Sequence, residues 1–155
     1  MADHSTTGAF LAQLLAGLAT RPNLVDIDVR LVEPSAEQVP SGGFLYLVRG
    51  PIQTSDRIAI ATMRRKRDET VTIPGVLQGW AATPEGGDDA VQAAFAAAED
   101  ILDELIAQIV AVWPAVGEST RSVLVEKLTW TPIPHDKGGW AVRGDYSLTY
   151  SSRVS

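Results

Sequence analysis

The sequence predicts an α+β domain, in which a mainly antiparallel or mixed β-sheet carries a long helix and an N-terminal helix packed on it. Two observations support this class. Residues 6–20 and 88–113 show the three- and four-residue periodicity of helices. Several segments between and after them alternate with the two-residue period of strands. At 155 residues, the chain has the length of one domain, residues 1–155.

The long helix predicted at residues 88–113 has the clearest pattern. Its large apolar residues recur at steps of three and four, which places them on one face. They are Val91, Phe95, Ala98, Leu102, Leu105 or Ile106, Ile109 and Trp113. Asp88 or Asp89 can cap the first turn. Pro114 ends the helix, because it lacks an N–H donor and disfavours a helical residue before it. We expect this helix to be the main support of the sheet.

The N-terminal segment predicts a shorter helix. Thr6 or Thr7 can cap its first turn, and the sequence Arg21-Pro22-Asn23 ends it. Its apolar stripe consists of Phe10, Leu11, Leu14, Leu15 and Leu18. We expect this helix to pack at the edge of the domain, and a helix that binds a partner is the alternative.

Four segments, two before and two after the middle of the chain, have the pattern of strands. Residues 24–33 alternate between apolar and charged side chains, which predicts one buried and one solvated face. The apolar run at residues 44–48 predicts a short inner strand. Residues 122–131 and 140–150 predict the last two strands, and Gly144 interrupts the apolar parity of the second, as a bulge would.

The middle of the chain allows two interpretations. Residues 57–63 and 70–80 predict strands, and the charged residues 64–69 lie between them. These charged residues form either a hairpin turn or part of one long bent strand. Pro74 cannot donate a hydrogen bond to a neighbouring strand, so it predicts a sheet edge or a bulge at that position.

Composition excludes several classes of protein. The chain has no cysteine, which rules out a disulfide scaffold and a thiolate zinc site. A net charge of −6 argues against general affinity for nucleic acid. The apolar run at residues 10–19 is too short to cross a bilayer, and no basic residue precedes it as in a signal peptide. We therefore expect a soluble protein that does not bind a membrane.

No group of residues predicts catalysis. The two histidines, His4 and His135, have no second imidazole near them in the sequence, which a histidine metal site would need. A pair of His135 and Asp136 lacks a nucleophile, and neither Ser119 nor Ser122 has an elbow motif around it. Glycine-rich phosphate loops are also missing. The prediction is a protein without a catalytic residue, a metal or a cofactor.

The distribution of charge is more informative than any motif. The only concentrated basic cluster consists of Arg64, Arg65, Lys66 and Arg67. The acidic group on the long helix consists of Glu99, Asp100, Asp103 and Glu104. No lysine or arginine occurs from residue 68 to residue 120. If the two groups lie at different edges of the fold, copies can associate head to tail into a ring or a filament.

Each charged group also has a simpler interpretation. Carboxylates on the polar side of a helix are usually solvated, and a contact for a basic partner or an acid catalyst is the alternative here. A basic cluster that binds DNA usually has stacking aromatic residues nearby, and none lies between Tyr46 and Trp80. A solvated face is therefore the simpler interpretation of the acidic group, and a contact with a neighbouring subunit is the hypothesis for both groups.

Three stretches together suggest a family. They are RRKRDETVTIPGVLQGW, the Gly-Gly-Asp sequence at residues 86–88 with the long helix after it, and the closing GGWAVRGDYSLTYSSRV with Arg153 near its end. Residues 44–155, which contain them, resemble the small tail terminator (tail completion) proteins of long-tailed bacteriophages, particularly those that infect actinobacteria. The predicted N-terminal helix and first strand agree with that family in order only.

The resemblance implies a structural protein of the virion. Proteins of that family place helices on a curved sheet and assemble as a homohexameric ring, which caps the tail tube and joins it to the head-completion or stopper protein. DNA would pass through the channel without specific binding, and no catalysis or cofactor is expected. The protein would reside in the tail or neck after assembly in the host cytoplasm. The acidic net charge suits such a channel, because tight phosphate contacts would hinder sliding DNA.

Two other kinds of protein stay open as alternatives. One is another part of the same machine, such as a head–tail connector component or a tail tube subunit. The other is a small ligand-binding α+β domain or enzyme, with a deep pocket lined by Trp80, Trp130 and Trp140. A ring is expected for the first group, and a monomer or dimer for the second.

Overall fold

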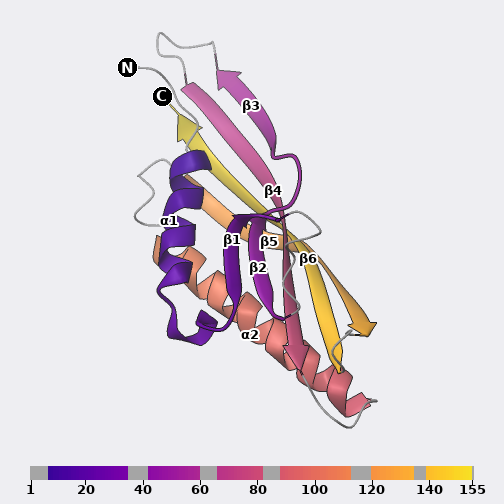
Figure 1. Ribbon diagram of the computed structural model, residues 1–155. Helices are drawn as coiled ribbons and strands as arrows, with labels where there is room; N and C mark the ends of the chain where they lie inside the picture. Colours follow the sequence, from indigo (N-terminus) through magenta and orange to yellow (C-terminus); the bar gives the residue numbers. More distant parts are fainter. Residues whose placement is uncertain are drawn as a thin grey trace.

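The computed structural model describes residues 7–34, 42–59, 66–81, 88–112, 120–134 and 139–154. It confirms the α+β class, with two α-helices, a short 3-10 helix and one mixed sheet in the described residues (Figure 1). The helical elements are α1 (Thr7–Ala19), η1 (Pro22–Leu24) and α2 (Asp88–Val112). The strands are β1 (Asp28–Val32), β2 (Phe44–Val48), β3 (Gln53–Ala59), β4 (Lys66–Ala81), β5 (Thr120–Pro134) and β6 (Trp140–Val154).

The strands are ordered β1-β2-β4-β6-β5 across the sheet. β1 pairs with β2 in parallel, and the other neighbours are antiparallel. β3 is an additional strand, which pairs with the first half of β4 on the same side where β2 pairs with the second half. β4 and β6 are therefore the long central strands, and they join the two parts of the sheet.

The helix α2 starts at the predicted residue, and its described part ends at Val112. The face that it buries differs from the prediction. The fully or nearly buried residues are Ala90, Ala94, Ala98, Ile101, Leu105, Ile109 and Val112. The larger residues Val91, Phe95 and Leu102 are only half-buried at the flank. Of the two alternatives at the centre, Leu105 is buried and Ile106 is exposed.

A row of alanines faces the sheet because the helix crosses it very closely at Gly79 of β4. A Cβ atom added to Gly79 would lie 2.2 Å from the backbone nitrogen of Ala98 and 2.7 Å from the carbonyl oxygen of Ala94. Only glycine fits such an approach of two backbones. The small residues of α2 thus allow close packing that the pattern of large residues did not predict.

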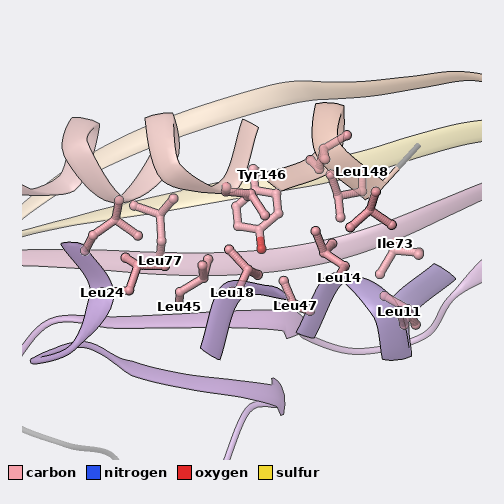
Figure 2. Packing of buried hydrophobic residues seen from close by; sticks show 14 of the residues in the cluster. Leu11, Leu14, Leu18, Leu24, Leu45, Leu47, Ile73, Leu77, Tyr146 and Leu148 are labelled. Atoms are coloured by element: carbon pink, nitrogen blue, oxygen red, sulfur yellow. The ribbon is translucent and has the colours of Figure 1, made fainter. Parts of the chain in front are cut away.

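The core lies between the sheet and the two helices. Figure 2 shows Leu14 and Leu18 of α1 close to Leu45 and Leu47 of β2, with Tyr146 of β6 beside them. The expected place of α1, packed on the sheet, is confirmed. The Tyr146 hydroxyl is fully buried, and it donates a hydrogen bond to the carbonyl of Tyr46 at 3.0 Å. Burial raises the pKa of Tyr146, so the hydroxyl stays a donor.

The first strand begins later than predicted. The expected strand covered residues 24–33, but residues 22–24 form η1 and β1 begins at Asp28. Proline at the start of η1 favours the helical turn, which the backbone hydrogen bond from Leu24 to Arg21 closes. Val25 is consequently 80% exposed, although its parity placed it on the buried face. The inner strand predicted at residues 44–48 is confirmed.

The open question at the middle of the chain is resolved in favour of two strands. β3 and β4 form an antiparallel ladder that ends where Ala59 pairs with Lys66. Residues 66–69, expected to interrupt the strands, belong to β4. Residues 60–65 lie outside the described part of the chain.

The prediction that Pro74 marks an edge strand is wrong, because β4 is central. Its register with β6 is also continuous at Pro74, so no bulge is present there. Pro74 lies between the residues of β4 that pair with β3 and those that pair with β2. Its carbonyl accepts a hydrogen bond from Arg49, which follows β2, at 2.6 Å. In a strand, the backbone N and O atoms of one residue point to the same side. The N atom of Pro74, which carries no hydrogen, therefore points to the gap between β2 and β3.

The last two strands are longer than predicted. β5 reaches Pro134, three residues into the expected loop, and β6 continues to Val154. The bulge expected at Gly144 lies instead in β5, between Glu126 and Thr129. Gly144 itself is in regular register, and a Cβ atom there would lie 2.7 Å from the Trp130 ring. Glycine at this position thus makes room for the indole.

Candidate subunit interface

The structure describes part of the predicted interface. Lys66 and Arg67 are the first residues of β4, at the end of its ladder with β3. Arg64 and Arg65 lie outside the described residues. Glu99, Asp100, Asp103 and Glu104 all lie on α2, as expected. The described residues of the two charged groups thus lie on two different elements, Lys66 and Arg67 on β4 and the four acids on α2.

The acidic and basic groups are far apart along the sheet. Glu99 follows Ala98, which lies against Gly79 near the end of β4. Lys66 begins the same strand. At about 3.3 Å per residue, the distance from Lys66 to Gly79 along β4 is roughly 40 Å. Figure 1 shows the end of the β3–β4 ladder projecting away from α2. Opposite charges therefore lie at separate ends of one domain.

The four acidic residues of α2 are not equivalent. Glu99, Asp100 and Asp103 are exposed and form no ion pair within the described part of the chain. Glu104 is half-buried and binds residues next to α1. Its Oε2 lies 2.8 Å from Nη1 of Arg21, and its Oε1 accepts a hydrogen bond from Nδ2 of Asn23 at 2.6 Å. Glu104 is thus already engaged inside its own subunit.

Arg21 binds two successive turns of α2. Besides its ion pair with Glu104, its Nε donates to Oε1 of Gln108 at 2.8 Å. Glu104 and Gln108 are four residues apart, so they lie on the same side of the helix. This fork fixes α2 against the end of α1, and it explains why one carboxylate of the acidic group is not free for a second subunit.

The fork makes stability depend on pH. Hydrogen bonds from Asn23 and Arg21 hold the pKa of Glu104 below its ordinary value of 4.5. A carboxyl whose pKa is lower in the folded state stabilises the fold above its unfolded pKa, and this stabilisation is lost as the pH falls through the folded pKa. The Glu104→Gln variant should therefore be less stable than the wild type at pH 7.

The difference between the two proteins should shrink below the ordinary pKa of 4.5 and vanish at lower pH. Urea unfolding at a series of pH values measures it. The Glu99→Gln variant is the control, because Glu99 forms no ion pair among the described residues, and it should not be less stable than the wild type at pH 7. An equal loss for both variants would contradict the role of the fork.

An open groove lies beside this fork. It is lined by Asn23, Asp100, Asp103 and Glu104, and its volume is about 460 Å³. Three carboxylates in a groove can attract a cation, but no three histidine or acidic side chains among the described residues are placed to hold a metal ion. The groove is therefore an acidic surface, suited to contact a basic side chain rather than to coordinate a metal.

The sheet face away from the helices holds an ion-pair network that sequence reasoning did not find. Glu33 lies 3.4 Å from Nε of Arg49 and 3.4 Å from Nη2 of Arg143. Asp145 pairs with Arg49 and lies 3.8 Å from Nε of Arg143. These four residues come from three parts of the chain, and the pairing of β1 with β2, of β2 with β4 and of β4 with β6 brings them together. The two acids balance the two arginines, so the network joins strands rather than binding an ion.

The described residues do not form the pocket expected for a ligand-binding domain from the three tryptophans. Trp130 lies against Phe95 of α2, with ring centroids 6.0 Å apart, and Trp140 packs against the same core. Trp80 pairs with Ala141 and has the opposite parity on β4 from the core residue Leu77. Because successive residues of a strand point to opposite faces, the sheet separates Trp80 from the other two.

Comparisons with known proteins do not assign the chain to a family. No protein-family model matches it, and no curated protein matches its sequence. Among the described residues, no helix combines the length and the apolar character that a membrane span needs.

Proposed function

We propose that this protein is a structural component of a long-tailed bacteriophage, a tail terminator that forms a ring on the tail tube. The observation that carries the proposal is the placement of opposite charges at separate ends of one domain, on α2 and on the β3–β4 ladder. Such surfaces suit a head-to-tail contact between copies, which closes into a ring when the rotation between neighbours allows it. The resemblance of residues 44–155 to tail terminator proteins supports the same conclusion.

The proposed ring has three kinds of contact. Each copy binds its two neighbours, most simply as a homohexamer. One face of the ring binds the tail tube protein, and the other binds the head-completion or stopper protein. DNA passes through the channel without a specific site, in agreement with the acidic net charge of the chain. No catalytic residue or cofactor takes part in this role.

Light scattering and electron microscopy test this function. At low salt and high protein concentration we expect a ring, with a mass of about 100 kDa for six copies of 16.6 kDa each. Rising salt should shift the protein towards the monomer, because screening weakens contacts between exposed charges. A monomer under all these conditions would contradict the proposal.

Other outcomes would identify the alternatives. Rings that stack into long cylinders without the tube protein would indicate a tube subunit. A ring that binds the stopper protein on both faces would indicate another connector component. A monomer or dimer that binds a small molecule would favour a ligand-binding domain.

The variant with Arg65→Glu and Arg67→Glu reverses two charges of the basic cluster and tests its role. If this variant still assembles into rings, the basic cluster is not part of the subunit contact.

A further inference from the structure

One flank of α2 carries an exposed stripe that is half acidic and half apolar. Glu99, Asp103, Ile106 and Val110 follow one another at steps of four, three and four residues, which places them on the same side of the helix. Ile106 is 41% exposed and Val110 is 62% exposed. Ile106 and Val110 lie one turn apart, so they form a small exposed apolar patch that a partner can cover.

Glu99, Ile106 and Val110 of this stripe lie on the side of α2 that faces away from α1, and Asp103 on the outer face also borders the groove beside the fork. The opposite flank holds Glu104 and Gln108, which bind Arg21 next to α1. Phe95, on the flank with the stripe, contacts Trp130 of β5 instead. Two acids of the stripe, four residues apart and of like charge, also destabilise an isolated helix slightly. Within the part of the chain that the structure describes, the stripe is thus partly open to a partner, and its two acids form no ion pair inside their own subunit.

The basic segment of the chain has matching chemistry. Residues 57–67 read RIAIATMRRKR, with apolar residues followed by four successive basic residues. An acidic and apolar stripe complements such a segment in both charge and hydrophobicity. No other segment of the sequence combines a run of basic residues with neighbouring large apolar residues in this way.

A subunit cannot place its own basic segment on its own acids. The ladder of β3 and β4 ends at Ala59 and Lys66, roughly 40 Å along β4 from the place where α2 crosses. Six residues join these two ends, and a chain of that length can reach only about 10 Å out from the ladder and back. Contact between the segment and Glu99 or Asp103 therefore requires a second copy.

We propose that the stripe Glu99, Asp103, Ile106 and Val110 is the docking surface for residues 57–67 of a neighbouring copy. The inference rests on the proposed ring, and it identifies the residues of α2 that form one side of the contact between neighbouring subunits. Of the acidic group on α2, only Glu99 and Asp103 belong to the proposed contact, because Glu104 belongs to the internal fork. Ile106 and Val110 are added to the contact. The contact is heterologous, because a stripe on one copy meets a different segment on the next.

Cross-linking tests the pairing directly, since the chain has no cysteine of its own. Arg65→Cys protein is mixed with Asp103→Cys protein and treated with a short bismaleimide. We expect a covalent dimer from the mixture and little from either protein alone. Thr131→Cys, on the sheet face away from the helices, replaces Asp103→Cys in the control mixture and should give no dimer. A dimer from Asp103→Cys alone, or equal yields with the control, would overturn the proposal.

A charge swap provides a second readout. Asp103→Lys and Arg65→Glu should each weaken assembly at least about tenfold, and mixing the two variants should restore it in part. The Asp103→Lys monomer should unfold at the same temperature as the wild type or slightly higher, because the introduced ammonium group would pair with Glu99 one turn earlier. If the wild type forms rings and both variants assemble equally well, this contact is wrong, while the proposed ring is not contradicted. If the wild type itself forms no ring, both proposals fail.

Discussion

Replacing Gly79 with alanine is expected to destabilise the domain by about 3 kcal/mol, at the upper end of the usual cost of overpacking. The added methyl group would lie 2.2 Å from the backbone nitrogen of Ala98 and 2.7 Å from the carbonyl oxygen of Ala94. These are backbone atoms in the middle of a long helix, so they cannot move as the end of a side chain can. α2 would have to lift away from β4, which separates it from the core.

Thermal or urea unfolding measures this effect. A loss of about 3 kcal/mol corresponds to a melting temperature lower by roughly 6–12 °C in a domain of this length. Gly8→Ala is the matched control, because nothing lies within 4 Å of the added Cβ atom there and the residue is in α1. The control should be neutral or slightly stabilising, as alanine favours a helix more than glycine does. Similar stability of the two variants would show that α2 does not pack against Gly79 as described.

The fold class was predictable because it depends on periodicity, which is local. The long helix, the inner strand at residues 44–48 and the α+β order all follow from patterns of neighbouring residues. The start of β1 and the place of Pro74 were not predictable in the same way. Residues 24–27 alternate as a strand does, yet the turn begun by Pro22 takes precedence over that alternation. Pro74 sits in a central strand only because β2 and β3 leave a gap beside it.

The candidate interface was predictable only in its composition. The sequence shows which residues are charged, but not that Arg21 approaches Glu104 from 83 positions away. The same limit applies to the network of Glu33, Arg49, Arg143 and Asp145, whose members meet through strand pairing. Hydrophobic periodicity placed large residues at the centre of the buried face of α2. Close packing at Gly79 instead requires alanines at that place, and Ile106 lies outside the buried face.

Leu105 and Ile106 are adjacent residues for which opposite results are expected. Leu105 is fully buried at the centre of the contact between α2 and the core. Leu105→Ala should lower the free energy of unfolding by about 2–5 kcal/mol, through lost burial and the cavity left behind. Leucine and alanine are both good helix formers, so helix propensity adds little to this loss. Urea unfolding at a concentration where the protein is monomeric gives the value.

Ile106→Ala should change the unfolding of the monomer much less, because 41% of the side chain is already exposed. Its effect is expected in assembly, where truncating an apolar residue inside a subunit contact weakens the ring. The two variants together therefore separate the two faces of α2, since one changes folding and the other association. Comparable losses of monomer stability would mean that Ile106 belongs to the core. In that case the stripe would lose its apolar half, and charge alone would have to position the neighbouring copy.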